Sequence, residues 1–218
     1  MMIKPQKYRI AFVLDALYYP FTYPEIIASL AARKYRIDAA PPQSPLGGAR
    51  IYVKGYIASK EGCIIQVNDD RGIIACEGQI IDSVIASAKE IVGLAESDFK
   101  VNIPSDINYC ELIASVVVSD CGNPLETIKT FSEDKYRMFD EILGVESAGY
   151  SMRVIPKDGN PTEKSWFDIS VTPRFSTSDT EYYIEVVFRK EREVEDVLSF
   201  AAHLNENISL IINKLRGA

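Results

Sequence analysis

Few residues in this chain have the types and spacing that catalysis or metal binding requires. Its 218 residues contain one histidine, His203, and four cysteines. The cysteines are separated by 13, 34 and 11 residues, a spacing that contains no CxxC pair and matches no zinc-ligand pattern. They are Cys63, Cys76, Cys110 and Cys121. Because three of them lie in or next to apolar runs, we expect four buried, reduced thiols that bind no metal.

Acidic residues can act in pairs as general acid and general base. The chain has 31 of them, and the sequence singles out no pair. Asp69 and Asp70 stand at a predicted hairpin tip, where acids and glycine serve turn geometry rather than a metal. His203 falls on the polar side of a predicted helix, near Asp196 and Ser199. No P-loop, GxGxxG, HExxH or GxSxG motif with the required context is present. The sequence leans toward a non-enzymatic protein with no catalytic residues and no cofactor, without deciding the point.

The composition is that of an ordinary globular protein, 47% hydrophobic and 25% charged, which argues against disorder. The apolar run 10–19 contains Asp15 and is followed by Pro20, so it is too short to cross a bilayer. It also lacks the small-residue cleavage site of a signal peptide. We therefore expect a soluble cytoplasmic protein with no membrane partner.

Charge is distributed unevenly along this acidic chain. Residues 1–100 carry 12 Lys and Arg against 11 Asp and Glu, whereas residues 101–218 carry 12 against 20. A negative field repels phosphate, and no cluster of basic residues is dense enough to form a local positive patch. The sequence therefore disfavours nucleic acid as a partner.

The hydrophobic periodicity predicts one order of elements twice: a strand, a helix, three strands and a long helix. In the first half the ranges are 8–16, 22–33, 50–58, 63–67, 73–77 and 79–94. In the second half they are 109–119, 123–143, 150–156, 166–173, 181–189 and 193–215. Apolar residues recur at helical spacing through 123–143, as expected for one face of an amphipathic helix. The stretch 35–48 is rich in proline and glycine and is predicted to be a loop.

Two such halves imply an α+β fold. We predict two pseudo-repeats of strand-helix-strand-strand-strand-helix, residues 1–100 and 101–218, that form a curved antiparallel sheet with helices on one face. Pairing of the two repeats edge to edge would give a single sheet with pseudo-two-fold symmetry. Two separate α+β domains are the alternative.

The run 62–78, GCIIQVNDDRGIIACEG, followed by a long helix, resembles the TATA-binding protein family. That family has a strand, a turn with glycine and a basic residue, a strand that ends in glycine, and then a helix. Here Arg71 and Gly72 stand at the turn, and Gly78 ends the second strand. The specific match covers 62–94, and the rest of the chain resembles the family in its order of elements. The resemblance implies a fold like that of the TATA-binding protein.

Departures from the family argue against carrying over its DNA binding. The family binds the minor groove with a basic, apolar concave sheet and inserts aromatic wedges that kink the DNA. Glu77 stands here where the family has a small polar residue, and the second hairpin keeps neither the glycine turn nor its sequence. The resemblance therefore implies the fold and not DNA binding, and no binding residue is transferred from the family.

The uncovered face of the sheet is the surface that we expect to function. Period-two alternation directs one set of polar and aromatic residues away from the helices. They are Tyr52, Lys54, Tyr56, Arg153, Trp166, Asp168 and Arg189. Trp166 is the single tryptophan, and tryptophan, tyrosine and arginine are the types that anchor interfaces. We therefore expect a non-enzymatic binding protein that uses its open sheet face or a sheet edge for a protein partner or for self-association as a homodimer.

Two alternatives remain open. In the first, loops or the other repeat cover Trp166 and the tyrosines, and these residues belong to the core. The chain would instead bind a small ligand, as a carrier or an enzyme, in a pocket between sheet and helices gated by the loop 35–48. A closed apolar cavity with converging polar groups would favour this second function.

Overall fold

The structure is a computed structural model that describes the chain apart from residues 16–18, 20, 39–52 and 218. The strands are Met2–Leu14 (β1), Arg36–Ile37 (β2), Lys54–Lys60 (β3), Cys63–Asn68 (β4), Ile73–Gly78 (β5), Ile107–Ser119 (β6), Met152–Val154 (β7), Trp166–Pro173 (β8) and Tyr182–Lys190 (β9). The α-helices are Pro24–Ala32 (α1), Ile81–Ser97 (α2), Ile103–Asp106 (α3), Pro124–Tyr136 (α4), Asp140–Leu143 (α5), Val194–Ala202 (α6) and Leu204–Leu215 (α7). Short 3-10 helices are Asp69–Arg71 (η1), Arg137–Phe139 (η2) and Phe175–Thr177 (η3).

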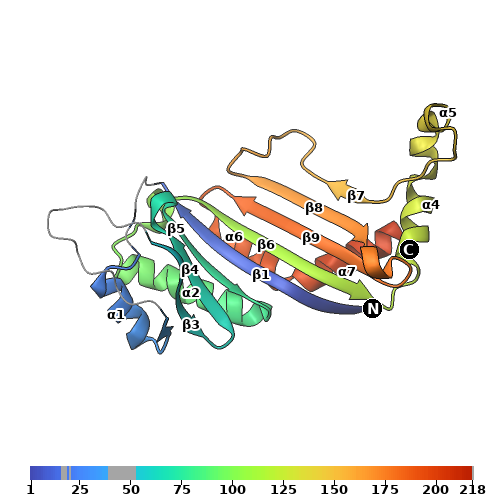
Figure 1. Cartoon of the computed structure of the whole chain (residues 1–218). Helices are drawn as coiled ribbons and strands as arrows, with labels where there is room; N and C mark the ends of the chain where they lie inside the picture. Colours follow the sequence, from blue (N-terminus) through green and yellow to red (C-terminus); the bar gives the residue numbers. More distant parts are fainter. Residues whose placement is uncertain (16–18, 20, 39–52, 218) are drawn as a thin grey trace.

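Within the described residues, nine strands form one antiparallel sheet in the order β2-β3-β4-β5-β1-β6-β9-β8-β7. The α+β class and the antiparallel sheet are thus confirmed. The first strands of the two halves, β1 and β6, pair at its centre, where both are 13 residues long (Figure 1). β1 begins six residues before the predicted start, and its register shifts between Pro5 and Lys7. A shift of this kind tolerates proline, which cannot donate to the ladder.

The two faces of the sheet differ in what covers them. Alternate residues such as Ile10, Phe12 and Leu112 are buried beneath the helices. α2 contacts β1 and β5, α6 contacts β6 and β9, and these two helices contact each other. Figure 1 shows α2, α6 and α7 on the same side of the sheet. We call this side the helix-covered face, and the opposite side, which carries Arg9 and Ile113, the open face.

The last helix is interrupted at His203, where a single helix over 193–215 was expected. His203 ends α6, with its Nδ1 atom 2.8 Å from the carbonyl oxygen of Ser199. α7 then buries a fresh apolar stripe, Leu204, Ile208, Ile212 and Leu215. Each of the two helices therefore has its own buried apolar face.

The β4–β5 hairpin forms as predicted, with Gly72 in the left-handed region at φ 58°. The role of Asp69 goes beyond turn geometry, however. Its side chain is completely buried, and its carboxylate accepts hydrogen bonds from the backbone N–H groups of Phe21 and Val53, both at 3.2 Å. Asp69 therefore ties two distant segments to the hairpin.

Most of the predicted loop 35–48 lies outside the described residues. Its first part contributes Arg36–Ile37 as the edge strand β2, which pairs with β3. Tyr52 also lies outside the described residues. In β3 the register shifts between Tyr56 and Ala58, so that Ile57 and Ala58 are both buried.

Residues 124–143, comprising α4, η2 and α5, form an arm at the end of the sheet farthest from α1 (Figure 1). Helical spacing of apolar residues ordinarily marks a buried face. Here Ile128 is buried, but the exposed fractions of Met138 and Ile142 are 71% and 77%. α4 contacts β8 and α7, and Figure 1 shows α5 projecting beyond them. The distal part of the amphipathic stripe therefore faces solvent.

Candidate functional site

Apart from Tyr52, which lies outside the described residues, the predicted site residues lie on the open face but do not form one site. The strand registers place Lys54 and Tyr56 on β3, and Arg153, Trp166, Asp168 and Arg189 on β7, β8 and β9. Six strand spacings separate β3 from β8, which amounts to about 29 Å along the sheet. The two groups therefore sit near opposite edges. Lys54 and Tyr56 are exposed, and 56% of Tyr56 is accessible to solvent.

Arg189 is occupied by contacts within the chain. Its Nε and Nη2 atoms donate to the same carboxylate oxygen of Glu111, at 2.8 and 2.6 Å. Its Nη1 atom donates to the carbonyl oxygens of Pro161 and Glu163, at 3.2 and 3.0 Å. The guanidinium also lies 4.7 Å from the ring centre of Tyr109. Arg189 thereby fastens the connection between β7 and β8 to the centre of the sheet.

The prediction that Trp166 is exposed is wrong. Only 6% of its surface is accessible. The β7–β8 connection folds over the indole, so that a Cβ atom added at Gly159 would lie 3.5 Å from the ring. Arg189 holds this connection through its two carbonyl contacts, and Ser165 accepts a hydrogen bond from the N–H of Glu191. The alternative in which a loop covers Trp166 is therefore the correct one.

Arg153 and Asp168 join the edge strand β7 to β8. Arg153 Nε donates to Asp168 Oδ1 at 2.8 Å, and Nη2 donates to Oδ2. The hydrogen bonds to Asp168 raise the pKa of Arg153. Each side chain of this pair has its hydrogen-bonding partner on the neighbouring strand. Neither is therefore free to define a binding site alone.

The described part of the open face carries more basic than acidic side chains, whereas the whole chain is acidic. Among the described residues this face carries seven basic side chains, Lys4, Lys7, Arg9, Arg36, Lys54, Arg153 and Arg189. It carries five acidic ones, Asp38, Glu77, Glu111, Asp168 and Glu185. Five of the seven basic side chains are within ion-pairing distance of these acids. The positive charge available to an external ligand is therefore small.

Sequence reasoning missed the largest accumulation of exposed apolar side chains. Of the sixteen large apolar side chains that are exposed in the described part of the chain, nine fall within residues 131–155. These nine are Phe131, Met138, Phe139, Ile142, Leu143, Val145, Tyr150, Val154 and Ile155. We call them the apolar surface. Helical spacing over 123–143 was the available signal, but periodicity does not say whether anything covers the stripe.

A groove adjoins the apolar surface on the helix-covered side of β7. It has a volume of about 310 Å³ and lies between α4, β7, β8 and α7. Its lining residues are Phe131, Met152, Val154, Ile169, Leu210, Ile211, Lys214 and Leu215. Seven of the eight are apolar, so the groove suits apolar side chains rather than a polar metabolite.

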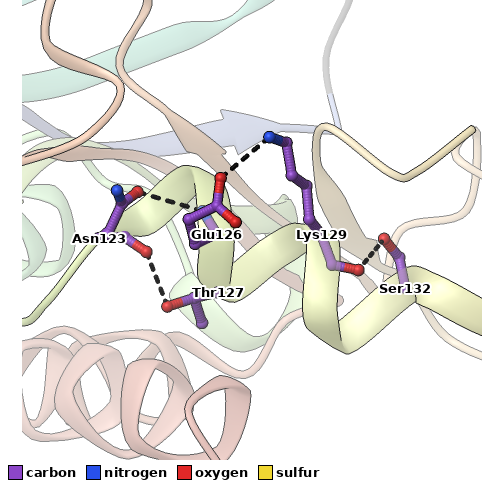
Figure 2. A network of polar contacts seen from close by, with 5 residues as sticks. All are labelled: Asn123, Glu126, Thr127, Lys129 and Ser132. Atoms are coloured by element: carbon purple, nitrogen blue, oxygen red, sulfur yellow. Dashed lines mark hydrogen bonds and ion pairs between the residues drawn. The ribbon is translucent and has the colours of Figure 1, made fainter.

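Polar contacts fix the base of the arm, as Figure 2 shows. The Asn123 side chain caps α4 by accepting from the N–H of Glu126 at 3.1 Å, and the Thr127 hydroxyl donates to the Asn123 carbonyl at 2.9 Å. Glu126 in turn pairs with Lys129 at 2.9 Å. An N-cap of this kind stabilises a helix by about 1 kcal/mol. The arm therefore begins from a fixed point.

Ser132 links the arm to the strand that follows it. Its hydroxyl shares one proton between the carbonyl oxygens of Ile128, at 2.8 Å, and Lys129, at 3.1 Å, the second of which Figure 2 shows. The same oxygen accepts from the N–H of Gly149 at 2.8 Å. A Cβ atom added at Gly149 would lie 2.6 Å from the Ser132 hydroxyl oxygen, so glycine is required there. The contact sets the entry of the chain into β7.

The cysteines do not form a reactive site. All four are buried free thiols. A hydrogen bond with Cys76 lowers the pKa of Cys63 to about 7, while the same contact and burial raise that of Cys76. Reactivity also requires access, and the side chains of Cys63 and Cys76 are completely buried on the helix-covered face.

Comparison with known proteins adds no identification. No protein-family model matches the chain, and no curated protein is significantly similar to it in sequence. None of the helices among the described residues is long and apolar enough to cross a membrane.

Proposed function

We propose that the chain is a non-enzymatic binding protein that docks a protein partner or a second copy at the β7 edge of its sheet. The observation that carries this proposal is the apolar surface. It gathers nine large exposed side chains into 25 residues of sequence. Large exposed apolar side chains gathered in this way are typical of interaction sites.

The position of β7 supports the same proposal. β7 is the last strand of the sheet and pairs only with β8 among the described strands. Edge strands accept additional strands or cover unless charge, proline or a bulge protects them. Val154 and Ile155 are 41% and 48% exposed at this edge. Apolar contacts and backbone pairing would therefore act together there.

The open face contributes less than the sequence suggests. Trp166 is buried, and Arg153 and Arg189 are engaged by acids within the chain. Tyr56 and Lys54 remain accessible near the other edge. They form secondary contacts in this proposal.

A small-ligand function has weaker support. The space between sheet and α2 that is lined by Phe12, Phe21 and Ile91 has a volume of about 10 Å³. That is about the minimum for one water molecule. The groove of about 310 Å³ lies between α4, β7, β8 and α7, all in the second half of the chain. The gating loop of that alternative lies mostly outside the described residues.

We also propose that the fold consists of two pseudo-repeats, residues 1–100 and 101–218, and that it is like that of the TATA-binding protein. The sheet order supports it: β5-β4-β3 lie outward from β1 as β9-β8-β7 lie outward from β6. Each half also ends in a helix or helix pair on the same side of the sheet (Figure 1). Duplex DNA is not part of the proposal, because most open-face basic groups are paired.

A capture experiment with matched variants tests the proposed function. Ile142→Asp places a charge in the apolar surface, and Ile80→Asp places one at another apolar residue, 57% exposed, that precedes α2. Ile80 is the N-cap residue of α2, and aspartate is favourable at an N-cap, so the control should fold. We expect Ile142→Asp to capture about one tenth or less of the native partner that wild type captures. A loss of this size is typical when an anchor residue is removed. Equal capture by Ile142→Asp, with loss in Tyr56→Asp, would instead place the binding site on the open face.

A further inference from the structure

Two apolar surfaces of this chain face solvent without covering each other. One is the tip of the arm, where Met138, Phe139 and Ile142 are 71%, 42% and 77% exposed. The other is the groove of about 310 Å³. Among the described residues that line the groove, Phe131 represents α4, and η2 and α5 contribute none. The arm tip and the groove are thus separate and both unpartnered within one chain.

The two edges of the sheet show what the groove lacks. At the β2 edge, α1 contacts β2 and buries Ile26, Ile27 and Leu30. In the second half, α4 holds the place of α1 in the element order. Of the large apolar side chains of α4, only Ile128 is buried. One edge therefore has a helix packed into the core, and the other has a groove beside a helix that extends away from it.

The sizes of the two surfaces match. A cavity of about 150 Å³ holds one benzene molecule, so the groove has room for about two large side chains. Phe139 and Ile142 are three residues apart on consecutive helical segments, which places them on the same side of the arm. A pair of side chains from one turn would fill the groove.

Charge is complementary as well. The charged residue that lines the groove is Lys214, and Arg216 lies next to it at the end of α7. Residues 124–146 carry six acidic side chains against three basic ones. Arg137 is already within 3.4 and 3.6 Å of Glu133 and Asp134. Arg137 is therefore engaged, and Glu141, which forms no ion pair among the described residues, can approach Lys214 of another molecule.

We propose that two copies of the chain exchange arms: the arm tip of each copy docks in the groove of the other. The inference rests on the proposed function, in which the apolar surface is the docking site, and it names the occupant. The arrangement is isologous, because each copy gives the same arm and offers the same groove, so the assembly closes as a two-fold dimer. Each dimer contains two equivalent arm–groove contacts.

The mass of the full-length chain in solution is the first test. At micromolar concentration, sedimentation should give twice the 24.4 kDa of one chain. Ile142→Asp alters the arm and Leu210→Asp alters the groove, at side chains that are 77% and 60% exposed. Each variant alone should be monomeric, since both contacts of its dimer are altered, whereas Ile80→Asp should remain a dimer. Circular dichroism and the melting temperature confirm that each variant is folded.

Mixing the two variants distinguishes exchange from other dimers. A mixed pair retains one intact contact, formed by the arm of Leu210→Asp and the groove of Ile142→Asp, so association should reappear in the mixture. Similarly, Ile142→Cys and Leu210→Cys should form a disulfide with each other when oxidised together, because the native cysteines are buried. Self-linked Ile142→Cys dimers, or a mixture that stays monomeric, would overturn the exchange.

The outcomes also separate this inference from the proposed function. A wild-type chain that is monomeric, but whose partner capture is lost in Ile142→Asp, overturns the exchange and leaves the docking surface standing. A monomeric chain whose capture is unaffected by Ile142→Asp overturns both.

Discussion

Arg189 on β9 and Glu111 on β6 form an ion pair in which two guanidinium nitrogens donate to one carboxylate oxygen, at 2.8 and 2.6 Å. The two side chains are only 18% and 12% exposed. Arg189 also holds the backbone of the β7–β8 connection through Pro161 and Glu163. Arginine is a residue type that often anchors interfaces, but the role of Arg189 here is structural.

Arg189→Ala should lower the free energy of unfolding by about 3 kcal/mol, because it leaves the largely buried carboxylate of Glu111 without a partner. Urea unfolding of the variant measures the loss. Arg153→Ala is the matched control: Arg153 pairs with Asp168 but is 68% exposed, so its removal should change stability far less. Equal losses in the two variants would contradict the structural role of Arg189.

Trp166 should report a buried environment. It is the single tryptophan, so the intrinsic tryptophan fluorescence arises from it alone. We expect iodide to quench its emission weakly in the folded protein and strongly after unfolding. Trp166→Ala should lower stability by about 3–5 kcal/mol, as for truncation of a core aromatic residue, and Trp166→Phe should lose less. Strong quenching in the folded state would show that the β7–β8 connection does not cover the indole.

Asp69 should give the protein a distinctive pH dependence. Burial raises its pKa, and the N–H groups of Val53 and Phe21 oppose that rise only in part. Because the folded pKa lies above the unfolded one, the contribution to stability is fully present below the unfolded pKa and is lost as pH rises through the folded pKa. Compared with Asp69→Asn, which does not titrate, wild type should lose stability upward from about pH 4.

The measurement is urea unfolding of both proteins across this pH range. Asp69→Asn should itself be less stable than wild type by about 2 kcal/mol at low pH, because its amide NH₂ cannot accept from one of the two buried N–H groups. A wild-type advantage that grows as pH rises would show that the two backbone hydrogen bonds lower the pKa more than burial raises it.

Duplex DNA should not bind at physiological salt. The net charge of the chain is −7, and two of the three basic side chains of β1, Lys7 and Arg9, lie 2.7 and 4.0 Å from Glu77. An electrophoretic shift assay at sub-micromolar protein in about 0.15 M salt should show free DNA only. Glu77→Gln removes the shared acid and is the variant in which weak binding should first appear. A shift with wild type would show that the sheet surface outweighs the net charge.

Local patterns predicted the elements better than their ends. The alternation in 166–173 gave β8 with its observed bounds, because a strand with one apolar face has a strict period of two. The early start of β1 was missed, since Pro5 and the register shift beside it interrupt that alternation. The break at His203 carries no proline or glycine, so the sequence offered no signal for it.

The candidate site was harder to predict, because periodicity places a side chain on a face but does not say what covers that face. Trp166 lies on the open face as its period requires, and a loop from a neighbouring segment buries it. The reverse holds for Ile142, whose helical spacing is typical of a core position although no described segment covers it. Both outcomes depend on tertiary contacts between segments, which single-sequence patterns do not contain.

Hydrogen–deuterium exchange of the free and the assembled protein tests the central claim, that the apolar surface is the docking surface, most directly. Assembly with the captured partner, or with a second copy, should slow exchange in residues 131–155. Exchange in β3 and in the central strand β1 should stay unchanged. Slower exchange in β3 and β1, with residues 131–155 unchanged, would contradict the account and return the site to the open face.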